Sequence, residues 1–203
     1  NAAAAPITEE EPGRLAFVYG GRRYILRLTG SFQRDNALTA LEVASCLEEK
    51  GFSIPDEAKE AGLAGVVMPC RQEILRRTPL LMLDGAHNPH GLAALAETLR
   101  RMPEAGSLTL LAGMLRDKNT AACAALLGPL CRHIVCCTPG GTDRALPGEE
   151  LAAQMRPYCP ETIAAAAPGE ALELAWEKAA GGPLLIAGSF YLCRELRPRL
   201  QGL

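Results

Sequence analysis

Residues 80–100, LLMLDGAHNPHGLAALAETLR, place an acid, a histidine and an asparagine where an apolar run gives way to a helical pattern. Asp84 ends the apolar run, and His87 and Asn88 follow in a glycine-containing turn before Pro89. A carboxylate at such a strand end can accept hydrogen bonds from ribose hydroxyls, and the first N–H groups of the helix can bind an anion. His87 can contact a phosphate or transfer a proton. Asn88 and Pro89 are also typical of a helix N-terminus, so the turn can equally be structural.

Two later segments place polar side chains directly after apolar runs. In GMLRDKNT, residues 113–120, Asp117 and Lys118 follow one such run. The lysine can pair with a carboxylate or a phosphate, or it can lie at a solvated helix start. In AGSFYL, residues 187–192, Ser189 can bind an anion or cap the last helix, and the cap is the favoured interpretation.

Five repeats of a short apolar run and a helical pattern must position these side chains. Such alternation predicts an α/β fold, a doubly wound and mostly parallel sheet with helices on both faces. Ligands bind such sheets at the carboxyl ends of the strands, where the candidate residues stand. The predicted strands are 80–84, 108–112, 133–137, 161–165 and 183–187, and the predicted helices are 89–102, 119–127, 148–156, 169–179 and 190–199.

The first third of the chain has a different pattern. A β-hairpin is predicted around Gly20-Gly21, and residues 1–12, which lack the segments of a secretory signal, are expected to be a mobile lead-in. One hairpin does not supply the strands for a separate core, so we expect residues 1–78 to be part of a larger neighbour and residues 79–203 to be a complete domain. The other predicted elements are a helix at 35–51 with a glycine C-cap, a helix at 56–63 after Pro55, and an extended segment at 66–75.

Composition limits the classes of protein that this chain can be. Its 203 residues suit one domain with a piece of another, and 48% apolar with 22% charged residues is ordinary for a globular protein. A net charge of −2 argues against a dedicated nucleic-acid binder. No apolar run reaches the roughly 18–20 residues that a membrane span needs. We therefore expect no nucleic acid and no membrane among its partners, and we expect a monomer.

The eight cysteines form no CxxC pair, and most of them lie in apolar segments. We expect buried, reduced thiols, hence a cytoplasmic protein, and no metal ligands among them. The cysteines are Cys46, Cys70, Cys123, Cys131, Cys136, Cys137, Cys159 and Cys193.

The segment LDGAHNPHG strongly resembles the signature of folylpolyglutamate synthase/dihydrofolate synthase, a branch of the Mur ligase family. Five further segments resemble elements of that family in the same order, and the resemblance runs from about residue 15 to residue 200. It implies a Rossmann-like Mur ligase C-terminal domain at 79–203, preceded at 1–78 by the tail of the central ATP-binding domain. The five segments are LTGSFQRDNALTALEVASCL, MPCRQEIL, GMLRDKN, TPGGTDRALPGEELA and LLIAGSFYL.

The resemblance implies an ATP site that this chain shares with a central domain. By that resemblance Asn36 contacts the adenine, Arg71 reaches the phosphates and Asp84 holds the ribose hydroxyls. His87 lies beside the phosphates and is a catalytic candidate. No GxxxxGK[ST] phosphate loop occurs in the 203 residues. The phosphate loop, the ligands of Mg²⁺ and the folate-side site are therefore expected in preceding sequence, and we expect these residues alone to ligate nothing.

The reaction that the resemblance implies is amide ligation. A carboxylate of a folate or dihydropteroate takes the γ-phosphoryl group of ATP, and the amine of L-glutamate then displaces phosphate from the acyl phosphate. Lys118, a second catalytic candidate, and Ser189 are implied to face the glutamate. Mg²⁺ and basic groups offset the phosphate charge, so positioning and electrostatics carry most of the catalysis.

Three positions depart from the family pattern. Phe32 stands where the family usually has histidine, Cys70 replaces a glycine, and Gln72 replaces a phenylalanine. A Cβ at position 70 restricts the backbone that carries Arg71.

Two other functions remain open at this point. One is a Mur ligase of cell-wall peptide synthesis, which uses the same chemistry on another acceptor, although DGAHNP and GSFYL favour the folate branch. The other is an α/β binding or interaction module without catalysis.

Overall fold

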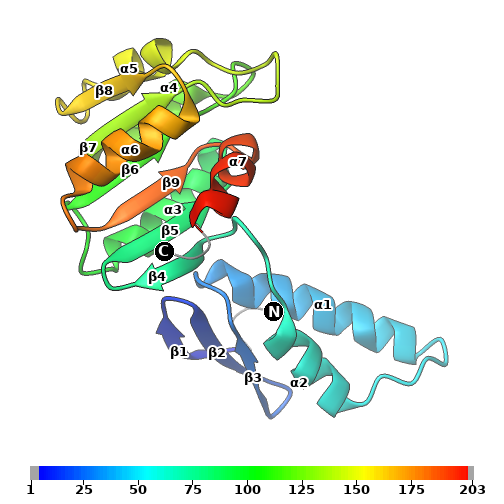
Figure 1. The fold of residues 1–203 in the computed structure, drawn as a ribbon. Coiled ribbons are helices and arrows are strands. Elements are labelled where there is room, and N and C mark those ends of the chain that lie inside the picture. Colours follow the sequence, from blue (N-terminus) through cyan, green and yellow to red (C-terminus); the bar gives the residue numbers. More distant parts are fainter. Residues whose placement is uncertain (1–4, 201–203) are drawn as a thin grey trace. The chain divides into compact units, whose positions relative to one another are not determined.

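The computed structural model describes residues 5–200, which form two compact units that divide between Met68 and Pro69 (Figure 1). The sequence predicted a boundary after residue 78. The division falls earlier because strand β4 (Glu73–Arg77) pairs with strand β5 (Leu80–Asp84) and so belongs to the larger unit.

The smaller unit contains a three-stranded antiparallel sheet in the order β1-β2-β3. Its strands are β1 (Ile7–Glu11), β2 (Arg14–Tyr19) and β3 (Arg22–Leu26). The predicted hairpin is confirmed: Gly20 and Gly21 join β2 to β3 with φ of +56° and +77°, the positive values that this two-residue turn requires. The expected lead-in is wrong for β1, which pairs with β2 and carries the charges typical of an edge strand. Residues 1–4 lie outside the described residues.

Two helices complete the smaller unit, α1 (Phe32–Glu48) and α2 (Asp56–Gly65). Helix α1 begins before the predicted residue 35, and the predicted glycine C-cap follows it. Gly51 has φ of +94°, and the N–H of Phe52 donates to the carbonyl of Leu47 at 3.2 Å. That bond satisfies a carbonyl at the end of the helix.

The smaller unit has a small apolar core, so the expectation that it lacks one is wrong. Phe17 and Tyr24 stack with their ring centroids 5.5 Å apart, and Phe17 is fully buried. The inner face of α1 covers the sheet, which makes two layers, and the sequence did not predict this because β1 was not expected. The buried apolar side chains are Ala5, Leu15, Phe17, Tyr24, Leu26, Leu28, Ala37, Leu38 and Leu41.

The larger unit is built on a six-stranded sheet in the order β4-β5-β9-β6-β7-β8. Every neighbouring pair is parallel except β4 with β5, which confirms the predicted mostly parallel sheet. The segment predicted as extended from residue 66 forms a strand only from Glu73. The remaining strands are β6 (Leu108–Ala112), β7 (Cys131–Cys137), β8 (Thr162–Ala165) and β9 (Leu184–Ala187).

Helices cover both faces of this sheet, as predicted (Figure 1). Helices α3, α4 and α5 pack on one face, and α6 and α7 pack on the other. Alternate strand residues serve the two faces: Leu110 of β6 belongs to the first cluster and Leu111 to the second. The helices are α3 (Pro89–Arg100), α4 (Thr120–Leu127), α5 (Gly148–Met155), α6 (Pro168–Ala179) and α7 (Phe190–Leu200).

The order of the strands places β9 at the centre of the sheet. The chain moves outward through β5, β6, β7 and β8, and then returns to insert β9 between β5 and β6. The carboxyl ends of β5, β9 and β6 are therefore adjacent, although β9 lies about a hundred residues after β5 in the sequence. Such a point of reversal is where open α/β sheets bind ligands.

The cysteines are free thiols, and six of the eight are buried. Cys46 is exposed and Cys131 is partly buried, so the expected burial holds for the other six. Within residues 5–200, no helix has both the length and the apolar character to cross a membrane.

The core of the smaller unit can be tested by two phenylalanines in the same unit. Phe17 is fully buried, whereas Phe52 is 61% exposed. We expect Phe17→Ala to lower the free energy of unfolding by about 3–5 kcal/mol, because it removes a buried ring and leaves a cavity. Phe52→Ala should change it by less than about 0.5 kcal/mol. Urea unfolding measures both, and equal effects would contradict the burial of Phe17 in an apolar core.

Candidate ligand site at the carboxyl edge of the sheet

The strand register aligns the ends of β5, β9 and β6. Asp84 pairs with Ala187, and Ala187 pairs with Ala112, so the last residues of these strands are level. The loops that follow them begin side by side and carry the candidate residues. The structure brings three of these, His87, Lys118 and Ser189, around one pocket.

Asp84 lies beneath this edge and binds backbone rather than solvent. Asp84 is only 2% exposed. The N–H of Gln72 donates to Oδ2 at 3.0 Å, and the N–H of Ala86 donates to Oδ1 at 2.5 Å. Burial raises the pKa of the Asp84 carboxyl to about 6, because desolvation disfavours the charged form. The two N–H donors, and then Arg71 and His87, act in the opposite direction.

The DGAHNP turn is held by its own side chains. Asn88 caps α3 by accepting a hydrogen bond from the N–H of Gly91 at 2.8 Å, with Pro89 in the first turn, as predicted. The Nδ1 of His87 lies 2.9 Å from the carbonyl oxygen of Gly85. With the proton on Nδ1 that contact is a hydrogen bond, and Nε2 is the acceptor available to the pocket.

Gly85 permits the close approach of an aromatic ring to this turn. A Cβ at position 85 would overlap the ring of Phe190, the first residue of α7. The Phe190 ring lies edge-on to the His87 ring, with centroids 5.9 Å apart, and the guanidinium carbon of Arg71 lies 5.7 Å from its centroid. Phe190 therefore joins the Arg71 segment to the His87 turn.

The segment that carries Arg71 has an unusual backbone. Cys70 and Gln72 have φ of +58° and +44°, in the left-handed region that favours glycine. The carbonyl of Cys70 accepts a hydrogen bond from the N–H of Gly85 at 2.7 Å, and its N–H donates to Oε2 of Glu73 at 2.8 Å. The replacement of a family glycine by Cys70 predicted a restricted backbone at this position. The hydrogen bonds around Cys70 hold this non-glycine residue in the left-handed region.

Glu73 is itself clamped by α7. The Nε of Arg197 lies 3.1 Å from Oε1, and its NH2 group donates to the same oxygen at 2.7 Å. Desolvation raises the pKa of Glu73, but the hydrogen bonds from Arg197 and Cys70 outweigh it and hold the pKa below its usual value. This ion pair anchors the Arg71 segment to the face of the sheet that α7 covers.

The pocket at the edge has a volume of about 170 Å³ and a cationic rim. Asp117 pairs with both Lys118, at 3.2 Å, and Arg144, at 3.4 Å. A short bridge between Leu115 and Ala145 holds the two loops that carry them together. The lining residues are His87, Leu115, Lys118, Arg144, Ser189, Phe190 and Tyr191.

Ser189 both caps α7 and lines the pocket. Its Oγ accepts a hydrogen bond from the N–H of Tyr191 at 3.0 Å, which confirms the favoured cap interpretation. The residue is 1% exposed, so only a group that enters the pocket can reach its hydroxyl.

Asn36 belongs to the smaller unit. It is exposed on α1, and its Nδ2 donates to Oε1 of Gln33 at 2.9 Å. Gln33 is buried, and its Nε2 has no hydrogen-bond partner within residues 5–200.

Sequence reasoning missed several residues of the edge. Arg144 lies in the TPGGTDRALPGEELA segment, which was used for the resemblance but assigned no side-chain role, and the short bridge to Leu115 could not be read from it. Phe190 and Tyr191 follow Ser189 directly in the sequence. Gln72 is 2% exposed, and its Oε1 has no partner in the described part of the chain, so it offers an acceptor to a ligand.

The side chains around the pocket are suited to an anion. Among residues 5–200 no three or more histidine, cysteine, aspartate or glutamate side chains are grouped so that they could hold a metal ion. Lys118 and Arg144 supply positive charge, and Ser189 a hydroxyl, to a volume that fits a carboxylate or a phosphate group.

A doubly wound α/β domain with a pocket rimmed by cationic side chains at its topological reversal has the architecture typical of ligand-binding α/β domains. Residues 70–190 match the family model of the Mur ligase glutamate ligase domain, and the chain belongs to this family. The match confirms the resemblance inferred from the sequence motifs.

The relatives of this chain include folylpolyglutamate synthases. The folylpolyglutamate synthase of Lacticaseibacillus casei is 30% identical over 176 residues, which are 86% of this chain and 40% of that protein. A solved Mycobacterium tuberculosis folylpolyglutamate synthase complexed with ADP and AMPPCP matches with a TM-score of 0.81 and 29% identity, over 96% of this chain and 47% of that chain. A bifunctional folylpolyglutamate synthase/dihydrofolate synthase from Yersinia pestis, complexed with AMPPNP and Mn, matches with a TM-score of 0.70 and 25% identity, over 92% and 44%. The chain thus spans less than half the length of each of these relatives.

The buried carboxylate predicts a specific pH dependence of stability. The folded pKa of Asp84, about 6, lies above the ordinary value near 3.8. Between these values the folded state binds more protons than the unfolded state, so its stability falls as the pH rises towards 6 and is level above it. We expect the wild-type free energy of unfolding to fall by on the order of 2–3 kcal/mol relative to Asp84→Asn between pH 4 and pH 7. Urea unfolding across this range measures the difference, and parallel curves for the two proteins would contradict it.

Proposed function

We propose that this protein is an ATP-dependent carboxylate-amine ligase that adds L-glutamate to a folate or dihydropteroate. The observation that carries the proposal is the pocket of His87, Lys118, Arg144 and Ser189 at the strand reversal of a Mur ligase glutamate ligase domain. The folylpolyglutamate synthases among its relatives favour a folate over a cell-wall peptide as the acceptor.

The nucleotide binds, in this proposal, at the Asp84 edge and in part to residues outside this sequence. Arg71 reaches its phosphates, His87 lies beside them, Asp84 receives the ribose hydroxyls, and Asn36 contacts the adenine. The unpartnered oxygen of Gln72 supports a hydroxyl-bearing ligand here, because a hydroxyl donor would satisfy that buried acceptor. The two N–H groups that Asp84 already binds also give it a positioning role, since they fix both segments that face the ligand.

The pocket itself takes the incoming amino acid. Its volume of about 170 Å³ is too small for a nucleotide but suits a group of the size of a carboxylate on a short side chain. Lys118 and Arg144 bind the negative charge of glutamate, and the Ser189 hydroxyl orients it. The ion pairs with Asp117 keep both cations in place.

The chemistry requires two displacements. An oxygen of the folate carboxylate bonds to the γ-phosphorus of ATP and ADP leaves; the glutamate nitrogen then bonds to the carbonyl carbon, phosphate leaves, and the nitrogen gives up a proton. His87 accepts that proton at Nε2, and the imidazolium that results offsets the phosphate charge. Mg²⁺ supplies charge neutralisation on the phosphates when bound, and its ligands are expected outside the described residues.

The smaller unit, in the same proposal, is the tail of the central ATP-binding domain. The longer relatives support this, since matches of 96% and 92% of this chain occupy less than half of the solved chains. The phosphate loop is expected in the remainder, and the 203 residues alone are expected to ligate nothing. The eight free thiols support a cytoplasmic location, where thiols stay reduced.

The activity is tested with the protein in its full natural length. We expect ADP, phosphate and a glutamylated product when ATP and L-glutamate are supplied with a dihydropteroate or a reduced folate. Replacing the folate by a muramoyl peptide should abolish turnover. Turnover with the muramoyl peptide alone would place the protein in the cell-wall branch, and no ATP turnover with any acceptor would support a non-catalytic module.

The role of Lys118 is tested in the same assay. We expect Lys118→Gln to raise the KM for glutamate about tenfold or more, because a charge-assisted hydrogen bond to the substrate is lost, with little change in the KM for ATP. Lys178→Gln, an exposed change on α6, is the matched control and should leave both values unaltered. A rise in the KM for ATP alone would contradict the assignment.

A further inference from the structure

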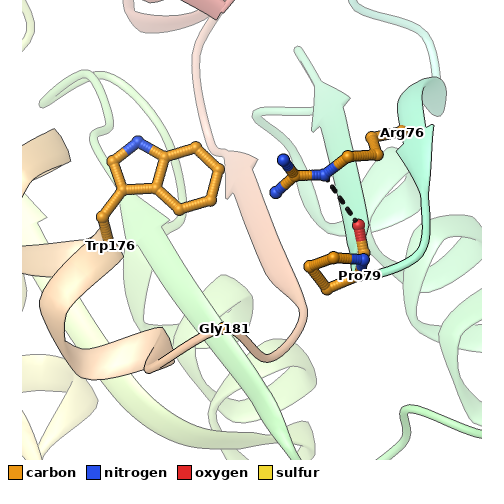
Figure 2. Close-up of a pocket in the computed structure, with 4 residues that line it drawn as sticks. All are labelled: Arg76, Pro79, Trp176 and Gly181. Atoms are coloured by element: carbon orange, nitrogen blue, oxygen red, sulfur yellow. Dashed lines mark hydrogen bonds between the residues drawn. The ribbon is translucent and has the colours of Figure 1, made fainter. Parts of the chain in front are cut away.

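A second and larger cavity lies at the other end of the strands of the six-stranded sheet, away from the carboxyl edge. It has a volume of about 470 Å³ and is lined by Arg76, Pro79, Trp176 and Gly181 (Figure 2). Arg76 and Pro79 flank the turn from β4 into β5, and Gly181 precedes β9. The cavity is therefore at the amino ends of β5 and β9, whereas Asp84 and Ala187 end the same strands at the carboxyl edge. It is separate from the site proposed above.

One aromatic ring and one guanidinium form its facing walls. Figure 2 shows the Arg76 side chain directed from β4 towards the indole of Trp176, which projects from the last turns of α6. The guanidinium carbon lies 5.4 Å from the centroid of the indole ring. The guanidinium therefore stacks near the indole, and both residues are partly exposed, so the surface beside and above the pair is open to a ligand.

One hydrogen bond orients the Arg76 guanidinium and leaves its two terminal nitrogens available to a ligand. Its Nε donates to the carbonyl oxygen of Pro79 at 3.2 Å, which holds the plane of the guanidinium. Within residues 5–200 its two terminal nitrogens donate to no protein acceptor. The four lining residues include no acid, so the guanidinium charge is not neutralised by the wall of the cavity. A preoriented guanidinium of this kind binds a carboxylate through two parallel hydrogen bonds.

We propose that this cavity binds a small planar aromatic carboxylate. The carboxylate pairs with the terminal nitrogens of Arg76, and the ring lies against the indole of Trp176 and the apolar ring of Pro79. The volume lies within the range of roughly 300–1,000 Å³ that is usual for small-molecule sites. Binding here does not depend on the ligase activity proposed above and makes the cavity a second ligand site of the domain.

Trp176 is the single tryptophan in the sequence, so its indole N–H resonance reports on this cavity alone. The resonance is assigned by its loss in Trp176→Phe, and the chain is titrated with 2-naphthoate and with neutral 2-naphthamide. We expect a saturable shift with the acid and an affinity for the amide that is about tenfold weaker or more, because the charge-assisted pair is lost. Addition of ADP should not displace the acid, which separates this site from the proposed nucleotide site.

Variants of the guanidinium complete the test. Arg76→Gln should weaken naphthoate binding about tenfold or more, and Arg76→Lys should weaken it less, because a lysine keeps the charge but loses the fork. Lys178→Gln, a nearby change of the same charge on α6, should leave the affinity unchanged, and the thermal unfolding midpoint checks that each variant is folded. The proposal is overturned by the absence of a saturable shift, by equal affinities for acid and amide, or by an affinity that Arg76→Gln does not alter.

Discussion

A single buried carboxylate connects the parts of the carboxyl edge. Asp84 accepts hydrogen bonds from the N–H of Gln72, in the segment before β4, and from the N–H of Ala86, in the turn after β5. These two segments carry Arg71 and His87, so the positions of both side chains depend on one residue that is itself almost without solvent contact. Desolvation opposes its ionisation, and the N–H donors offset that penalty only in part. The edge is thus held by an interaction whose strength depends on pH.

The order of the strands brings together the other loops of the carboxyl edge. The return of β9 between β5 and β6 brings Ser189 and Phe190 next to a turn that they follow by about a hundred residues. The bridge between Leu115 and Ala145 then adds Arg144 to Lys118. A pocket assembled from several loops can change its ligand by loop substitution without any change in the sheet.

Most of the larger unit could be predicted from the sequence, because its signals are local. Apolar runs of four to seven residues, Asn88 with Pro89 at a helix start, and glycines after helices each specify their own element. The wrong predictions concern strands whose formation depends on pairing with another strand. The acidic ITEEE segment has no strand pattern, and it becomes β1 only because β2 offers it a partner. In the same way β4 starts at Glu73 and moves the unit boundary because it pairs with β5.

The α/β class, the elements from residue 80 onward and the turn that carries Asp84, His87 and Asn88 can be predicted from the residues alone, since they depend on periodicity, capping and motif. Which side chains meet depends on how the whole chain folds, and folding had several effects that no local pattern showed. It buried Asp84 against two N–H groups, added Arg144 and Phe190 to the edge, and set Arg76 opposite Trp176 at the far end of the strands. The physical reason is that such contacts join residues that are distant in the chain, and they follow from strand order and register, which no local pattern encodes.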